Sequence, residues 1–164
     1  AGRLPVTFYK ATEQLPDFED YSMQGRTYRY FKGEALFPFG YGLSYTSFEI
    51  GEAQLSKKRI HANEPVNLEL SVKNTGKLDG DEVIQIYIRR LQDKEGPLKT
   101  LRAFKRVHLK AGEKKHVTFQ LQDDSFKFFD TESNTMRVMS GDHEILYGAS
   151  SMEEGLRHIK IKIE

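Results

Sequence analysis

The sequence predicts an all-β protein: an antiparallel β-sandwich with an extended N-terminal strap. From about residue 47 onward, short runs alternate apolar and polar residues, which is typical of strands with one buried and one solvated face. Turns rich in Gly, Asn and Asp separate these runs, and none has the spacing of a convincing amphipathic helix. Ahead of them, 10 of the 19 aromatic residues (11 Phe and 8 Tyr) lie between residues 18 and 48.

Alternation and turn residues place each strand. Residues 47–55 predict the first strand, and the second spans 66–73, where Val66, Leu68, Leu70 and Val72 share the buried face. Residues 82–88 are almost continuously apolar and predict a central strand. The remaining strands are expected at 98–109, 116–121, 136–138, 144–148 and 156–163. In the last, Ile159, Ile161 and Ile163 point inward, while Lys160 and Lys162 discourage pairing at a terminal edge.

The number and spacing of these strands indicate the architecture. Seven or more short strands at regular intervals favour a sandwich of immunoglobulin type, with a small barrel as the alternative. Residues 11–24 lack a sustained period and predict a loop or a single helical turn.

The aromatic strap needs a partner surface. A fully buried aromatic ring contributes roughly 2 kcal/mol, yet Pro38, Gly40 and Gly42 prevent a local helix or continuous strand that could organise the rings. We therefore expect an ordered strap that docks onto a neighbouring surface. The alternatives are a solvated linker and entry of some rings into the core of the following domain. The candidate contact residues are Arg26, Tyr28, Arg29, Tyr30, Phe31, Phe37, Phe39, Tyr41 and Tyr45.

Composition excludes several classes of function. The chain has 164 residues, with 25 Lys and Arg against 24 Asp and Glu, and these charges are scattered, so neither nucleic acid nor a membrane surface is an expected partner. The absence of Cys excludes a disulfide framework, thiolate metal sites and a cysteine nucleophile. No apolar run approaches the ~20 residues that cross a bilayer. The opening Ala1-Gly2-Arg3 suggests an excised fragment.

Two motifs resemble a known family. The run GRTYRYF at 25–31, followed by FPFGYGLSYTSF at 37–48, is similar to the segment that joins the second catalytic domain of glycoside hydrolase family 3 to its C-terminal fibronectin type III-like domain. Gly80-Asp81-Glu82-Val83 and Gly148-Ala149-Ser150-Ser151 extend the resemblance through the rest of the chain. Departures occur at Ser140, His143, Phe128 and Phe129, where the family usually has proline, tyrosine, and tryptophan or tyrosine.

The resemblance implies a domain organisation and a set of partners. Residues 1–10 would end the preceding α/β sandwich domain, 11–46 would form the strap, and 47–164 the fibronectin type III-like sandwich. The partners would be the catalytic domains of the same polypeptide and, for that parent, a glycan. The parent would be periplasmic or secreted. It would remove terminal β-linked xylose or glucose with retention, and the compact spacing of the two motifs resembles the β-xylosidase branch more than the β-glucosidase branch.

No catalytic residue, cofactor site or metal site is expected in this chain. In the family, both catalytic carboxylates lie upstream of residue 1, so the chain alone should be inert. Asp79-Gly80-Asp81-Glu82 could suggest calcium, although a turn that caps a strand is the simpler interpretation. His108 and His116 would face each other only if the flanking strands form a hairpin, and they would not meet if the turn carries the chain between sheets.

The arginine and tyrosine pattern has two interpretations. Arg26 and Arg29 alternate with Tyr28 and Tyr30, which would suit stacking on a sugar or a nucleic acid. Packing within a domain interface is the favoured interpretation. Two further functions stay open: a carbohydrate-binding module, disfavoured because the chain lacks Trp, and a freestanding scaffold domain.

Overall fold

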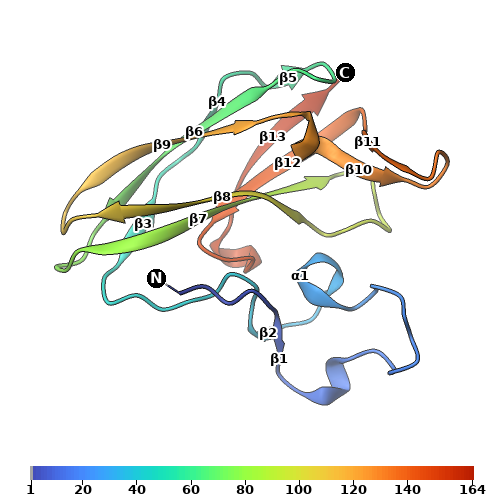
Figure 1. Cartoon of the computed structure of the whole chain (residues 1–164), viewed down its shortest axis with the longest axis horizontal. Helices are drawn as coiled ribbons and strands as arrows, with labels where there is room; N and C mark the ends of the chain where they lie inside the picture. The colour runs from blue at the N-terminus through green and yellow to red at the C-terminus, as the bar shows by residue number, and fades with distance from the viewer. Residues whose placement is uncertain (1) are drawn as a thin grey trace.

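Two β-sheets pack face to face in the computed structural model, which describes residues 2–164. The first residue of the expected 1–10 segment lies outside this range. The larger sheet has the strand order β5-β13-β12-β7-β8, antiparallel except where β5 runs parallel to β13 (Figure 1). Its strands are β5 (Arg59–Ile60), β7 (Gly80–Arg90), β8 (Thr100–Leu109), β12 (Gly141–Gly148) and β13 (Arg157–Ile163). β7 lies between β12 and β8, which confirms the predicted central strand.

The smaller sheet is built around β6. β6 (Val66–Asn74) pairs along one edge with β9 (Lys114–Leu121) and along the other with two short strands, β3 (Phe48–Ile50) and β4 (Gln54–Leu55). A hairpin of β10 (Lys127–Asp130) and β11 (Thr135–Val138) follows the 3-10 turn η2 (Asp123–Phe126). The described residues therefore form a sandwich and not the alternative barrel.

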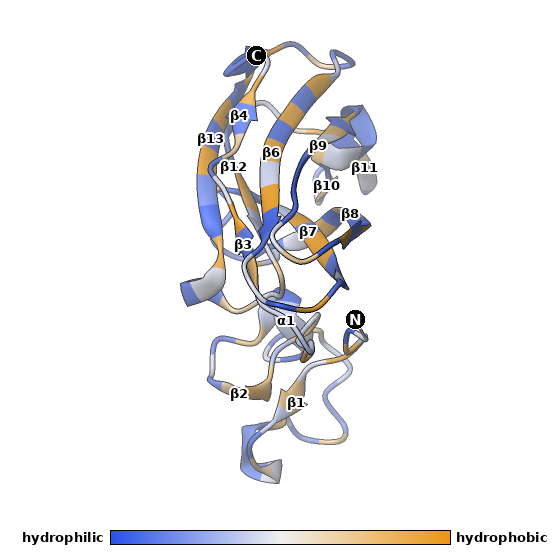
Figure 2. Cartoon of the chain, turned by 90° about the vertical axis from the view of Figure 1, so that its left-hand side faces the viewer, coloured by the Kyte–Doolittle hydropathy of each residue, from blue (hydrophilic) through white to orange (hydrophobic). Residues whose placement is uncertain are grey.

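The core lies between the sheets, where the alternation places it. Val66, Leu68, Leu70 and Val72 of β6 are buried, as predicted, against the apolar positions of the larger sheet. Figure 2 shows the same alternation as bands of opposite hydropathy along β6, β12 and β13. On β13, Ile161 and Ile163 are buried while Lys160 and Lys162 are exposed. β5 pairs with Lys162 and Ile163 at the end of β13, so β13 is not the terminal strand there, which corrects the prediction for Lys162.

The predicted first strand is interrupted, which corrects its extent. β3 and β4 are separated by residues 51–53, where the chain leaves the ladder and the Ala53 amide donates to the Tyr147 hydroxyl at 2.9 Å. The amide of Gly51 still bonds to the Ser71 carbonyl at 2.8 Å. Since a Cβ at Gly51 would lie 2.5 Å from Ser71 Oγ, this close approach favours glycine.

The turn after β8 carries the chain from one sheet to the other. β8 pairs only with β7, and β9 only with β6. His116 is therefore opposite Ser71 in the register, whereas His108 Nδ1 lies 2.8 Å from Asp81 Oδ1 on β7. The hairpin that would have joined the two histidines does not form.

Residues 2–46 form a lobe beneath one end of the sandwich (Figure 1). Within it, β1 (Phe8–Tyr9) pairs with β2 (Ala35–Phe37), and Leu4 exchanges backbone hydrogen bonds with Gly40 and Tyr41. The lobe also holds a 3-10 turn, η1 (Thr12–Gln14), and a single helical turn, α1 (Thr27–Tyr30). A last 3-10 turn, η3 (Glu153–Gly155), precedes β13. Within residues 2–164, every helix is too short to be a candidate membrane span.

Candidate interdomain surface

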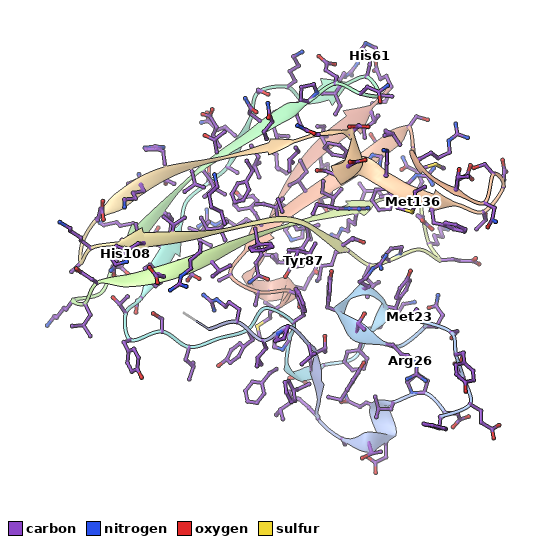
Figure 3. All side chains as sticks on the ribbon, in the orientation of Figure 1. Met23, Arg26, His61, Tyr87, His108 and Met136 are labelled. Atoms are coloured by element: carbon purple, nitrogen blue, oxygen red, sulfur yellow. The ribbon has the colours of Figure 1, made fainter. Side chains whose placement is uncertain are left out.

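The inner face of the lobe packs on the outer face of the larger sheet. Tyr28 stacks on Phe39 with ring centroids 4.4 Å apart, and its edge meets Tyr87 of β7 at 5.7 Å. Tyr87, Leu146 and Leu156 are buried in this second apolar cluster, separate from the main core. Figure 3 shows Tyr87 where the sheet meets the lobe. These contacts hold part of the strap against the sandwich.

A buried polar centre accompanies the rings. The Gln85 amide nitrogen donates to the carbonyls of Gly40 at 3.2 Å and Ala149 at 2.6 Å, while its oxygen accepts the Tyr87 hydroxyl at 2.5 Å. Burial, reinforced by the neighbouring Tyr28, raises the pKa of Tyr87, so the phenol stays neutral and remains a donor. The amide of Ser151 donates to the Phe39 carbonyl at 2.9 Å. Lobe, β7 and the loop after β12 therefore share one hydrogen-bond network.

Two further joints lie at the ends of the lobe. Arg3 donates to the Gly42 carbonyl at 2.8 Å and pairs with the buried carboxylate of Glu82. At the entry to the sandwich, Thr46 donates to the buried side chain of Asn74 at 2.7 Å. Lobe and sandwich are thus joined near both ends of the lobe as well as at Tyr28 and Phe39.

The outer face of the lobe presents apolar side chains to solvent. Phe8 is 45% exposed and meets the edge of Phe37, itself 39% exposed, at 6.3 Å. Phe37 also stacks on Tyr41 at 5.2 Å. Val6 and Leu36 are exposed on the same pair of short strands, β1 and β2, or beside it. We call this set, Val6, Phe8, Leu36, Phe37 and Tyr41, the outer patch.

The predicted contact residues divide among different roles. Tyr28 and Phe39 pack on the outer face of the larger sheet, which is the expected docking on a neighbouring surface. The alternative, entry of some rings into the core of the following domain, describes Phe48, which packs against the main core. Phe37 and Tyr41 belong to the outer patch, and Tyr45 is 97% exposed. Phe31 instead packs inside the lobe, with its ring centroid 4.9 Å from that of Tyr9.

The two strap arginines bind within the chain. Arg29 lies over the ring of its neighbour Tyr30 at 5.6 Å, a contact within the lobe, and packing at a domain interface stays a prediction. Arg26 donates to the backbone carbonyls of Asp17 and Asp20 rather than to a carboxylate.

Sequence reasoning missed contributors on both faces. Phe8 lies in the predicted 1–10 segment, outside the strap, and Gln85 lies within the apolar run that predicts the central strand. A buried amide inside an apolar strand is the signal that could have indicated a polar joint on its outer face. Phe18 and Tyr21, 94% and 92% exposed, extend the exposed aromatic surface along the strap.

A charged network fixes the neighbouring loop, residues 91–99. The Glu153 carboxylate forms ion pairs with Lys99 at 2.5 Å and with Arg89 at 2.9 Å. Arg89 also forms an ion pair with Glu144 at 2.6 Å. Burial raises the pKa of Glu153, but hydrogen bonds from Lys99 and Arg89 outweigh it and hold the pKa below its usual value. Gln24 of the lobe donates to the Glu95 carbonyl of this loop at 3.3 Å.

The acidic turn before β7 is engaged in structural contacts. Hydrogen bonds from Arg106 and His108 lower the pKa of Asp81. Asp79 accepts the Ala111 amide at 2.8 Å. Among residues 2–164, no group of three or more His, Cys, Asp or Glu side chains could hold a metal ion.

Comparisons with known proteins point to one family. Residues 82–151 match the model of the fibronectin type III-like domain. A xylan 1,4-β-xylosidase of Xylanibacter ruminicola is 53% identical over 162 residues, which cover 99% of this chain and 18% of that protein. Thermostable β-glucosidase B of Acetivibrio thermocellus is 42% identical over 130 residues, covering 77% of this chain and 17% of that protein.

Solved structures agree with the sequence relatives. The β-glucosidase EmGH1 of Erythrobacter marinus superposes with a TM-score of 0.82 at 34% identity, over 99% of this chain and 22% of that one. The chain thus spans about a fifth of the length of the relatives it matches.

Proposed function

The chain belongs to the fibronectin type III-like domains of glycoside hydrolase family 3 β-glycosidases, and from this premise we propose that it is a non-catalytic module that stabilises the catalytic domains of its parent polypeptide. The domain division proposed for it is a preceding-domain tail at 1–10, the strap at 11–46 and the sandwich at 47–164. The strap would connect the catalytic domains of the parent to the sandwich.

The two-faced lobe carries this proposal. Its inner face is already bound to the sandwich through Tyr28, Phe39 and Gln85. Its outer patch has no such cover within residues 2–164, although exposed aromatic rings there forgo burial worth roughly 2 kcal/mol each. The relatives are about five times longer than this chain, so a covering body from the same polypeptide is available.

The parent is proposed to act on terminal β-linked xylose. The supporting observation is the 53% identity to a protein named xylan 1,4-β-xylosidase, against 42% to one named β-glucosidase. The retaining mechanism follows from the family resemblance. Comparing kcat/KM of the parent on aryl β-D-xyloside and aryl β-D-glucoside tests this assignment, and a preference for the glucoside would reverse it.

The stabilising role is tested by opening the joint in the full-length parent. Replacing both Phe8 and Phe37 by Ser should lower the Tm of the parent by roughly 4 °C or more and reduce its soluble yield, because the outer patch loses its apolar contacts. The control is Phe129→Ser, since Phe129 is comparably exposed, at 55%, but lies on the β10–β11 hairpin of the sandwich.

The isolated chain separates docking from folding. In it, the double variant should lose less stability than in the parent, because Phe8 and Phe37, 45% and 39% exposed, lose only their contacts within the lobe. Excision of residues 11–164 from the parent should lower both Tm and soluble yield. A parent that keeps both values after excision would contradict the proposed function.

A further inference from the structure

A polar cavity lies at the end of the sandwich where Figure 3 labels His61 and Met136, away from the lobe. Its volume is about 530 Å³, within the roughly 300–1,000 Å³ typical of small-molecule sites. The end of β7, the β10–β11 hairpin, the segment leading into β12 and the end of β13 line it. No part of the proposed interdomain joint contributes to it.

One cation in this cavity lacks a counter-ion. Arg90, at the end of β7, lines the cavity and is partly buried, yet its side chain makes no hydrogen bond or ion pair with any of residues 2–164. Its Nε atom is fully buried without an acceptor. A buried donor without an acceptor is costly, and the planar fork of a guanidinium matches a carboxylate, so an anion in the cavity would supply the missing partner.

The acids of the cavity are mostly neutralised by other groups. Asp130 accepts a hydrogen bond from the Ser133 hydroxyl at 2.7 Å and forms an ion pair with Arg137 at 3.3 Å. Glu164 forms an ion pair with Arg59 at 3.6 Å. The carboxylates of Asp130 and Glu164 therefore compete only weakly with an incoming anion for Arg90. The carboxylate of Glu132, which forms no ion pair or hydrogen bond with residues 2–164, and the hydroxyl of Ser140 remain as groups for ligand hydroxyls.

The strand beside Arg90 holds a second unpaired polar atom. His143 is opposite Arg90 in the β7–β12 register and is fully buried. Its Nδ1 lies 3.1 Å from the Gly141 carbonyl, whereas its Nε2 is buried without a partner. The His143 imidazole contacts the rings of Phe126 and Phe128. It carries no negative charge that could compensate Arg90.

We propose that this cavity is a binding site for a sugar acid, whose carboxylate pairs with Arg90 and whose hydroxyls bind Glu132 and Ser140. A simple carboxylate would satisfy Arg90 alone, and a neutral sugar would leave it unpaired. The proposal is independent of the module's stabilising role.

Titration of the ¹⁵N-labelled chain with sodium D-glucuronate, at constant ionic strength, tests the site. Saturable amide shifts are expected around residues 130–140 and 163–164. D-xylose, with hydroxyls and no carboxylate, and acetate, with the carboxylate alone, should each bind at least ten-fold more weakly. Equal affinity for either probe, or shifts that do not saturate, would overturn the assignment.

Variants link binding to the guanidinium. Arg90→Gln should weaken glucuronate binding at least ten-fold, and Arg90→Lys several-fold, since lysine keeps the charge but loses the fork. Arg106→Gln is the matched control, because Arg106 is opposite Val83, about 23 Å from Arg90 at about 3.3 Å per residue. Wild-type affinity in a folded Arg90→Lys or Arg90→Gln chain would refute the role of Arg90. Glucuronate should also shift the ring resonances of His143, through the neighbouring charge.

Discussion

Single buried polar side chains connect parts of this molecule that are distant in sequence. Asn74 is fully buried, and its amide donates to the carbonyls of Leu78 at 2.7 Å and Leu109 at 3.2 Å while its oxygen accepts Thr46. Gln85 does the same for the lobe. Such groups contribute most through the penalty that follows when their partners are left unpaired.

Replacing Gln85 by Leu should therefore destabilise the isolated chain. The change leaves the Tyr87 hydroxyl and the carbonyls of Gly40 and Ala149 without their partner, so a loss of at least about 2 kcal/mol in the free energy of unfolding is expected. Urea denaturation measures it. Gln120→Leu, on the exposed face of β9, is the control, and equal midpoints for the two variants would contradict the proposed importance of the joint.

His143 should make stability depend on pH in the weakly acidic range. Burial lowers its pKa, the positive charge of Arg90 adds to that shift, and the Gly141 carbonyl and Asp142 oppose it. The unfolded chain, with a histidine pKa near 6.5, then binds more protons than the folded chain. Stability is complete above about pH 6.5 and falls as the pH drops from there toward the lowered folded-state pKa.

His143→Phe removes this titration. The free energy of unfolding of the wild type, measured by urea denaturation, should fall between pH 7.5 and 5.5, by up to about 1.4 kcal/mol per pH unit, and that of the variant should fall less. The carboxyl groups with lowered pKa, such as Asp130, titrate below this window and affect both proteins alike. Parallel pH profiles would show that His143 is not the responsible group.

At the scale of elements, two lysines bond across the gap between β8 and β9, the strands at one side of the sandwich. β8 and β9 each leave one edge without a strand partner. Lys105 of β8 donates to the Thr118 carbonyl at 3.0 Å, and Lys115 of β9 donates to the His108 carbonyl at 2.7 Å. Each edge thus has a carbonyl bonded to a cation from the other strand, which opposes pairing with another chain.

The lobe meets the larger sheet through a glycine that no other residue can replace without movement. Gly40 has φ of 78°, and a Cβ there would lie 2.0 Å from Gln85 Oε1. Gly40→Ala should detach this part of the strap and speed limited proteolysis within residues 11–46, because the Gln85 side chain must leave its network. Gly155→Ala, with open space around its Cβ, is the control. An unchanged cleavage rate would argue against a docked strap.

At the scale of the whole molecule, the carboxyl groups with a shifted pKa are held in structural contacts. A glycosidase needs a carboxyl group with a raised pKa to protonate the leaving group. Where a carboxyl pKa departs from its usual value in residues 2–164, it is lowered, as at Asp81, Asp130 and Glu153. These carboxylates are held ionised by hydrogen-bond donors and cations.

The isolated chain should accordingly fail to hydrolyse aryl β-D-xyloside, while the parent polypeptide, assayed in parallel, should be active. Release of the aryl alcohol, followed by absorbance at pH 5–7, measures this. Turnover by the chain alone that survives repurification would contradict its assignment as a non-catalytic module.

Local pattern determined the strands and the main core from sequence alone. The alternation in 66–73 specified which side chains of β6 are buried, because in a strand successive side chains face opposite sides. The apolar run at 82–88 likewise predicted the central position of β7. The aromatic excess in 18–48 predicted that rings of this segment pack on a neighbouring surface, and two of them, Tyr28 and Phe39, pack on the sandwich.

Only the tertiary structure decided which surface each strap ring meets. Tyr28 and Phe37 are equivalent in the sequence pattern, yet one packs on Tyr87 and the other faces solvent beside Phe8. The break between β3 and β4, the crossing from β8 to β9 and the unpaired Arg90 also depend on partners distant in the chain. Residue periodicity reports which face of an element is buried, but the identity of its partner is set by how the sheets and loops assemble.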